Sequence, residues 1–269
     1  MPMKKRMVGM LLIMILVLII IAGVYQISNA KFTMSYLYGN YDYIALVERT
    51  QGALNEVSPS YFDLDNNGDL VLNPVSNQLV TQMHAKGITV VPFLSNHWDR
   101  GKGRSALKNR EKLVNQIVSA IQQYQLDGVN VDIENLTEVD KDNYTAFVKL
   151  LKERLPNDKA LSVAVAANPN GWNYGWQGSY DYKALGEIAD DIVLMAYDEH
   201  FEGGVPGPVA SISFVEASVK EALKYVPSNK LVLGVPFYGR YWNTNTRKRR
   251  RRRHNEQNRK YGKAIPYSH

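Results

Sequence analysis

The chain has 269 residues, of which 45% are hydrophobic and 22% charged, and this composition is typical of a globular protein with one sizeable core. Because there is no cysteine, a disulfide framework, a zinc–thiolate site and a cysteine nucleophile are all excluded. The net charge of +6 comes from the C-terminal tail, where ten Lys and Arg residues follow residue 246 against a single Glu. Residues 7–246 are mildly acidic, so a nucleic-acid-binding surface is not indicated there.

The first thirty residues differ from the rest of the chain. Three basic residues at 4–6 precede an uncharged apolar run at 7–25, an order typical of an export signal or a signal-anchor. The run has the length of a membrane-spanning helix, although the small residues at 28–30 also offer a cleavage site. Residues 1–30 are therefore predicted to deliver the rest of the chain outside the cytoplasm, either membrane-anchored or secreted. A buried core helix is the alternative, which the lack of a polar face disfavours.

From residue 32 onward, short apolar runs alternate with stretches whose apolar residues recur at helical spacing. The runs are rich in Val, Ile and Leu and contain few charges, as in parallel strands that are buried on both faces. Helices are predicted around 79–83, 113–124, 137–155 and 215–223. Strands are predicted at 32–38, 57–62, 88–94, 128–134, 161–166, 192–197 and 231–237.

This alternation predicts a parallel α/β fold. A TIM (β/α)8-type barrel is favoured over a doubly wound sheet, because no glycine-rich phosphate loop follows the first strand. Seven strands are recognisable in the sequence and an eighth is not, so the barrel is predicted to be incomplete.

The segment 126–135 combines an apolar strand pattern with acidic residues. Because side chains alternate across a strand, its aliphatic residues face the helices, whereas Asn130, Asp132 and Glu134 face the barrel interior. Two carboxylates on one buried face repel each other, so at least one pKa is expected to be raised. A carboxyl group that stays protonated near neutral pH is what a general acid requires, and barrel enzymes place their chemistry at this end of a strand. A buried salt-bridge network is the structural alternative.

The same segment carries a family resemblance. Asp127-Gly128-x-Asn130-x-Asp132-x-Glu134 resembles the signature Asp-Gly-x-Asp-x-Asp-x-Glu of glycoside hydrolase family 18, the chitinase family. It departs from the signature at Asn130, where the family usually has an aspartate. In this form the segment is similar to the bacterial branch directed at spore cortex and peptidoglycan.

Two later segments extend the resemblance over residues 32–243. Residues 194–198 resemble the Met-x-Tyr-Asp motif of the family's sixth strand, and residues 234–240 resemble its seventh-strand motif. The three motifs occur in the family's order, and each falls at the end of a predicted strand.

The resemblance implies substrate-assisted, retaining hydrolysis of β-linked N-acetyl-hexosamine polymers, either chitin or the glycan of peptidoglycan. Glu134 would protonate the glycosidic oxygen, and the sugar's own 2-acetamido carbonyl would attack the anomeric carbon. Asp132 would orient the acetamido group, and Tyr197 would donate a hydrogen bond to its carbonyl oxygen. Because Asn130 cannot hold a negative charge, proton exchange between Asp132 and Glu134 is expected to differ from the family's usual pattern.

The substrate is expected to contact further residues of the motifs and several aromatic side chains near strand ends, which can stack on sugar rings. Packing within loops is the alternative for the aromatic residues. No cofactor and no metal are predicted: residues 63–69 resemble the start of a calcium loop, but Pro74 stands where the bidentate Glu is needed, so a hairpin turn is favoured. The predicted substrate-binding residues are Asn130, Tyr36, Trp98, Met195, Asp198, Tyr238 and Arg240.

The domain boundaries follow from these observations: a signal segment at 1–30, a catalytic barrel at 31–243 and a basic tail at 244–269. The tail contains seven consecutive basic residues at 247–253 and is predicted to be disordered. The family's eighth strand and small inserted α/β region are not recognisable after residue 243, so a truncated catalytic barrel is expected.

Three functional hypotheses remain open from the sequence. The first is an active hydrolase, expected as a monomer with a polysaccharide substrate and no nucleic-acid partner. The second is a sugar-binding protein on the same scaffold whose catalysis is impaired by the missing eighth strand. The third is a membrane-tethered protein whose basic tail binds anionic wall polymers or lipid headgroups.

Overall fold

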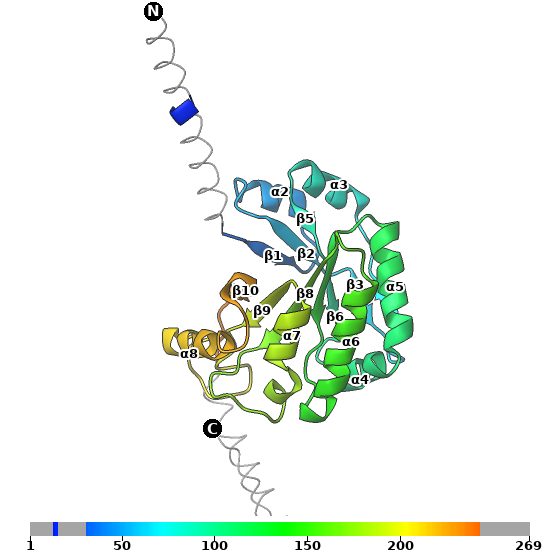
Figure 1. Cartoon of the computed structure of the whole chain (residues 1–269). Coiled ribbons are helices and arrows are strands. Elements are labelled where there is room, and N and C mark those ends of the chain that lie inside the picture. Colours follow the sequence, from blue (N-terminus) through cyan, green and yellow to red (C-terminus); the bar gives the residue numbers. More distant parts are fainter. Residues whose placement is uncertain (1–12, 16–30, 243–269) are drawn as a thin grey trace, which may run out of the picture.

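A computed structural model describes residues 13–15 and 31–242, and its strands form a curved wall that consists of two hydrogen-bonded sheets, one of three strands and one of seven (Figure 1). The chain breaks its strand pairing between β2 and β3 and again between β5 and β6. Because β2 pairs with β5 and β3 pairs with β6, these two breaks lie side by side and separate the sheet β1-β2-β5 from the sheet β10-β9-β8-β7-β6-β3-β4. All pairs are parallel except the β3–β4 hairpin. The strands are β1 (Met34–Leu37), β2 (Glu56–Pro59), β3 (Phe62–Leu64), β4 (Leu70–Leu72), β5 (Thr89–Val90), β6 (Phe93–Ser95), β7 (Gly128–Asp132), β8 (Ala160–Ala166), β9 (Asp191–Met195) and β10 (Leu231–Leu233).

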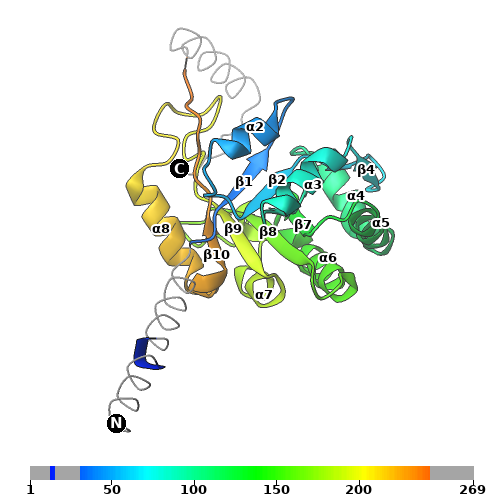
Figure 2. The same ribbon diagram turned by 90° about the horizontal axis from the view of Figure 1, so that it is seen from above.

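The helices cover the outer face of this wall (Figure 2). They are amphipathic, and α5 shows the pattern: Leu113, Ile117 and Ile121 recur at helical spacing and are fully buried. The helices are α2 (Tyr43–Glu48), α3 (Asn77–Ala85), α4 (Arg100–Lys108), α5 (Arg110–Gln123), α6 (Lys141–Arg154), α7 (Tyr182–Ile188) and α8 (Ile212–Ala222), with 3-10 turns η1 (Glu138–Asp140), η2 (Gln177–Ser179) and η3 (Ser228–Lys230).

The fold is a TIM-barrel-type α/β fold, as the sequence predicts. Every predicted strand is found, and the hairpin turn expected at 63–69 connects β3 and β4. Within residues 31–242 the wall is not closed, because β1 and β10 lie at its two ends and are not paired with each other.

Several predicted boundaries were wrong, and three of them have a clear local cause. The strand predicted at 128–134 ends at Asp132, where the main chain of Glu134 bonds a side chain instead of a neighbouring strand. The strand predicted at 231–237 ends at Leu233; Pro236 has no amide hydrogen to donate, and Phe237 is fully exposed. Thr137 caps the short turn η1 rather than a long helix, which begins only at Lys141.

The Asp-Gly pair that opens the acidic segment fixes the beginning of β7. Asp127 Oδ2 accepts a hydrogen bond from the Val90 amide at 2.7 Å and lies 2.7 Å from His84 Nε2. A Cβ atom on Gly128 would lie only 2.1 Å from the carbonyl oxygen of Ala160 on β8. These two residues of the signature therefore hold the acidic strand in place.

Gly128→Ala is expected to lower the free energy of unfolding by about 3 kcal/mol, because β7 and β8 must separate to admit the methyl group. Urea unfolding of the purified protein measures the change. Gly52→Ala is the control: Gly52 also has a positive φ, but nothing lies within 4 Å of its added methyl group. Gly52→Ala should lower the free energy of unfolding by about 1 kcal/mol, which is the penalty of left-handed backbone alone. Equal losses in the two variants would contradict the close approach.

Two predicted segments lie outside the described residues. Residues 13–15 are described as helix, but the rest of the apolar run at 7–25 is not, and neither is the basic tail from residue 243. Among the helices that the structure does describe, none combines the length and the hydropathy needed to cross a bilayer.

Candidate active site

A chain of polar contacts runs from β1 through β7 to β8. Tyr36 Oη donates to Asn130 Oδ1 at 2.9 Å, and Asn130 Nδ2 donates to Ser162 Oγ at 2.6 Å. Asn130 is fully buried, and both ends of its amide have a partner. These bonds confirm that position 130 faces the interior.

Asp132 lies one step further along β7 on the same face. Burial raises the pKa of Asp132 to about 6, and the nearby His97 opposes this rise. Its Oδ1 atom is buried and has no hydrogen-bond partner among residues 31–242. A buried carboxyl oxygen without a protein partner is free to accept a bond from a bound ligand.

His97 also lies close to a second carboxylate, that of Asp63. Its Nε2 atom lies 2.8 Å from Asp63 Oδ1, and its backbone amide donates to Ser95 Oγ at 3.0 Å. In the sheet register, Ser95 is the Cα partner of both Asp63 and Asp132, so the three residues form one row across β3, β6 and β7. When protonated, His97 therefore supplies a positive charge close to Asp132.

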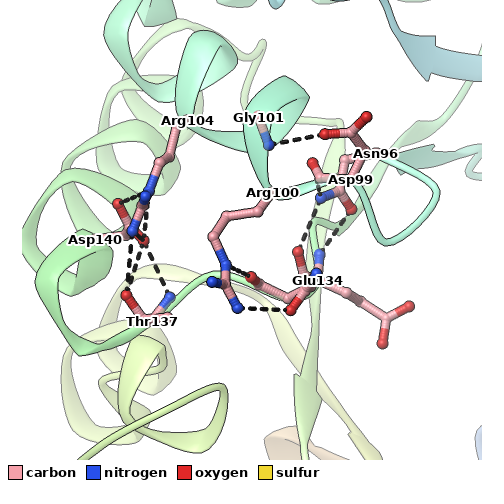
Figure 3. Close-up of polar contacts among 9 residues, drawn as sticks. Asn96, Asp99, Arg100, Gly101, Arg104, Glu134, Thr137 and Asp140 are labelled. Carbon is pink, nitrogen blue, oxygen red and sulfur yellow. Dashed lines mark hydrogen bonds and ion pairs between the residues drawn. The ribbon is translucent and has the colours of Figure 1, made fainter. Parts of the chain in front are cut away.

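Glu134 lies just beyond the end of β7. Burial, and then repulsion from Asp132 and Asp198, raise the pKa of Glu134 to about 8. A carboxyl group with this pKa is protonated at neutral pH and can donate its proton. Its side chain points away from helix α4 and away from the bonds that hold its own main chain (Figure 3).

Tyr197 and Asp198 follow β9 and approach the same carboxyl groups. Burial, and then Asp132 and Glu134, raise the pKa of Tyr197, so its hydroxyl stays protonated and remains a donor. Asp198 has a positive φ of 58° and accepts from Tyr238 Oη at 2.9 Å and from Arg240 Nη2 at 2.7 Å. The last two motifs of the sequence are thereby joined at Asp198.

Two further predicted substrate-binding residues, Met195 and Trp98, lie on an apolar side of the site that holds these carboxyl groups. Met195 is buried with Ala164 and Val193, and Tyr197 and Trp176 pack against that cluster. Trp98 packs edge-on against Trp176 with ring centroids 4.8 Å apart, and half of its surface stays exposed. Trp98 therefore contacts this apolar cluster through Trp176 and keeps an exposed ring surface.

A cavity of about 470 Å³ lies elsewhere, beside the ends of β1 and β2. Its lining includes Leu37, Tyr41, Tyr43 and Tyr61, and none of the predicted site residues contributes to it. The group around Asp132 and Glu134 is therefore distinguished by its buried ionisable residues rather than by the size of a cavity.

Sequence reasoning did not single out several residues that position this group. Asn96 bonds the main chain of Glu134 on both sides, and Tyr180 Oη donates to the Ile133 carbonyl at 3.2 Å. Ser162 and the Asp63–His97 pair were also missed as parts of the site. Their place in the sequence could have indicated two of these residues. Asn96 and His97 directly follow a predicted parallel strand, and functional polar residues of barrel proteins gather at strand ends.

A parallel barrel wall with a protonated glutamic acid, a second buried carboxyl and a tyrosine at its strand ends is the arrangement of a barrel enzyme that uses acid catalysis. The comparisons with known proteins assign the family. The model for "Glycosyl hydrolases family 18" matches residues 33–265, and the chain belongs to this family.

Its relatives include enzymes of spore-forming bacteria. A cortical fragment-lytic enzyme of Bacillus subtilis (strain 168) is 30% identical over 211 residues, which cover 72% of this chain and 49% of the relative. The chain spans between 32% and 66% of the length of the first three curated relatives that it matches.

Solved structures agree on the fold. A chitinase from Chromobacterium violaceum superposes with a TM-score of 0.71 at 25% identity, covering 77% of this chain and 69% of that one. The Bacillus cereus spore cortex-lytic enzyme SleL superposes with a TM-score of 0.69 at 20% identity, covering 88% of this chain and 59% of that one.

Proposed function

We propose that this chain is a glycosidase that cleaves β-linked polymers of N-acetyl-hexosamine, either chitin or the glycan of peptidoglycan. The observation that carries the proposal is the buried pair at the end of β7, in which Glu134 is protonated at neutral pH beside Asp132. Membership of family 18 and the likeness to a cortical fragment-lytic enzyme and to a chitinase support the substrate class.

The proposed reaction follows from the protonation states of this pair. Glu134 gives its proton to the glycosidic oxygen, and the carbonyl oxygen of the sugar's 2-acetamido group attacks the anomeric carbon as the bond to the leaving sugar breaks. Asp132 accepts a hydrogen bond from the acetamido N–H, using the Oδ1 atom that has no partner within residues 31–242. Water then opens the cyclic intermediate, Glu134 takes up the water proton, and the anomeric configuration is retained.

The neighbouring residues are proposed to hold the sugar in the reactive geometry. Tyr197 donates to the acetamido carbonyl oxygen, and Asp198 lines the same pocket, restrained by Tyr238 and Arg240. Met195 forms part of the apolar side of the site, and Trp98 offers an exposed ring on which a sugar can stack. Tyr36 and Asn130 fix the polar interior beneath Asp132.

The site is proposed to be displayed outside the cytoplasm. The positive flank at 4–6 and the apolar run at 7–25 support delivery by a signal-anchor or a cleaved signal. Residues 31–243 are proposed as the catalytic barrel. Its expected partner is the polysaccharide substrate.

Product analysis of the full chain tests the proposed function. The protein is incubated with N-acetylchitohexaose and, separately, with purified peptidoglycan, and new reducing ends are counted over time. We expect reducing ends from at least one of the two polymers. Binding to both without any release of reducing ends would instead favour an impaired, sugar-binding role for the same scaffold.

His97→Gln is expected to move the acidic limb of the pH–rate profile to higher pH. The protonated imidazole lowers the pKa of Asp132, so its removal raises that pKa, and Asp132 must then be ionised at a higher pH to accept the acetamido bond. The acidic limb is expected to shift by as much as about one pH unit. At pH values below this limb, the rate would then fall by up to about tenfold.

His84→Gln is the matched control for this experiment. It breaks a His–Asp pair of similar length, 2.7 Å, at the opposite end of β7. Its acidic limb should coincide with that of the wild type. A profile for His97→Gln that also coincides with the wild type would contradict the proposed electrostatic role of His97.

A further inference from the structure

The buried side chain of Asn96 holds the peptide groups on both sides of Glu134. Asn96 Oδ1 accepts from the Glu134 amide at 2.8 Å, and Asn96 Nδ2 donates to the Glu134 carbonyl oxygen at 2.8 Å (Figure 3). The same Nδ2 group donates to the carbonyl oxygen of Asp99 at 2.9 Å. Asn96 is 1% exposed, so these bonds are shielded from competing water.

These bonds replace a missing strand partner. Strand β7 ends at Asp132, and Glu134 lies beyond the last rung of the ladder. Without Asn96, the partly buried amide and carbonyl group of Glu134 would lose these partners, and each unpaired group is costly. The amide side chain therefore does for Glu134 what a neighbouring strand does for the residues before it.

Arg100 holds the next residue in the same way. Its Nε atom donates to the Asn135 carbonyl oxygen at 2.6 Å, and its Nη2 atom donates to Asn135 Oδ1 at 2.9 Å. Asn135 has a positive φ of 58°, a backbone conformation that disfavours residues other than glycine. The Asn135 side chain also donates to the Trp98 carbonyl oxygen at 2.8 Å, so the turn after Glu134 is tied down at several points.

The hydrogen bonds from Asn96 and Arg100 to residues 134 and 135 act together as a brace. This brace is attached to a helix whose position is itself fixed. Asp99 caps α4 by accepting from the amides of Gly101 and Lys102. Further along the helix, Arg104 forms an ion pair with Asp140, with its Nε atom 2.9 Å from Asp140 Oδ1. Asn96 and Arg100 thus connect the peptide of the acid to a helix that is anchored at both its start and its middle.

We propose that Asn96 and Arg100 are positioning residues for Glu134, which set the place of its carboxyl group by holding the two peptide units that carry it. The inference rests on the proposed function, because it assigns Glu134 as the proton donor. No hydrogen bond between the Glu134 carboxyl group and another described residue is found, so its position depends on its main chain. Displacing a catalytic group by about 1 Å can cost about 100-fold in rate.

Release of the brace has a second consequence for the proton donor. The pKa of Glu134 is raised first by its burial, so a Glu134 that moves toward solvent has a lower pKa and loses its proton at lower pH. Asn96 carries no charge, so its removal alters the burial of Glu134 and adds no new charge. The ionisable groups that face Glu134 stay in place: Asp132, Asp198, Tyr36, Tyr144, Tyr180 and Tyr197.

Asn96→Ala, made in the full chain, tests the proposal. We expect kcat to fall about 100-fold with a much smaller change in KM, and the basic limb of the pH–rate profile to move to lower pH. Hydrogen exchange of the Glu134 amide should accelerate relative to the neighbouring strand amides. Arg100→Met removes only the exposed part of the brace, so it should fold normally and show the same changes at about tenfold in kcat.

The chain offers a matched control for the loss of two hydrogen bonds between an asparagine side chain and the main chain. Asn168 Oδ1 accepts from the Trp172 amide at 2.8 Å, and Asn168 Nδ2 donates to the Trp172 carbonyl oxygen at 2.9 Å, in a loop after β8. Asn168→Ala removes this pair and leaves the peptide of Glu134 untouched. Its basic limb should coincide with that of the wild type.

The outcomes separate the inference from the proposed function. An active wild type whose Asn96→Ala and Arg100→Met variants keep its kcat and its basic limb would overturn the positioning role and leave the hydrolase assignment standing. If Asn96→Ala does not fold, Arg100→Met alone decides, and an unshifted basic limb overturns the inference. A wild type that releases no reducing ends would refute the proposed function. If the Glu134 amide still exchanged its hydrogen faster in Asn96→Ala than in that wild type, only the structural brace would be confirmed.

Discussion

Glu134→Gln is expected to lower kcat at least about 1000-fold without unfolding the protein. General acid catalysis contributes factors of this size, and glutamine fills the same volume but its amide is far too weak an acid to protonate the leaving oxygen. Initial rates on a chromogenic N,N′-diacetylchitobioside measure the loss, with circular dichroism to confirm the fold. The substrate should still bind, because Asp132, Tyr197 and Asp198 are unchanged.

Glu153→Gln is the control for this substitution. Glu153 lies on α6, and its ion pair within the described residues is with Lys149, at 4.0 Å, on the protein surface. Its neutralisation should leave kcat within about twofold of the wild type, as expected for a surface position. A Glu134→Gln variant that retains a comparable rate would remove Glu134 from the role of proton donor.

Asp132→Asn is expected to lower kcat about 100-fold and also to move the basic limb of the pH–rate profile. The amide cannot stabilise the positive charge that develops on the acetamido group during its attack, which removes a preorganised electrostatic contribution. Because the Asp132 charge helps to raise the pKa of Glu134, its loss lowers that pKa, and Glu134 then gives up its proton at lower pH.

Asp142→Asn, an exposed position at the start of α6, serves as the control and should match the wild-type profile. Rates of the three proteins from pH 4 to pH 10 on one substrate make the comparison. An Asp132→Asn variant with the wild-type basic limb would show that the two carboxyl groups are not electrostatically linked.

The wild-type profile itself follows from the two pKa values. The rate should rise with pH as Asp132, with a pKa of about 6, loses its proton, and fall as Glu134, with a pKa of about 8, loses its own. Since the two groups interact, the observed limbs belong to the pair and not to either residue alone. The account therefore places the maximum between these limbs, close to neutral pH.

Periodicity was enough to predict the framework of this barrel. The strands β7, β8 and β9 were predicted within three residues of their observed ends, because buried parallel strands give continuous apolar runs. The alternation along β7 also predicted which side chains enter the barrel. The bond from Tyr36 to Asn130 confirms that orientation.

The parts that were missed depend on contacts between distant segments. Asn96 and Glu134 are 38 residues apart, and nothing in the local sequence of either residue shows that an amide side chain replaces a strand. The early end of β7 is a consequence of that contact. The pairing of Ser162 with Asn130 was equally invisible, because a serine within an apolar strand is consistent with many environments.

The central claim is that the substrate's own acetamido group takes part in the reaction, next to Asp132 and beneath the proton of Glu134. Hydrolysis of a chromogenic N,N′-diacetylchitobioside and of the matching cellobioside, which has hydroxyl groups in place of the acetamido groups, tests this most directly. The account predicts release of chromophore from the first substrate, with retention of anomeric configuration, and none above background from the second. Equal hydrolysis of both substrates would contradict it.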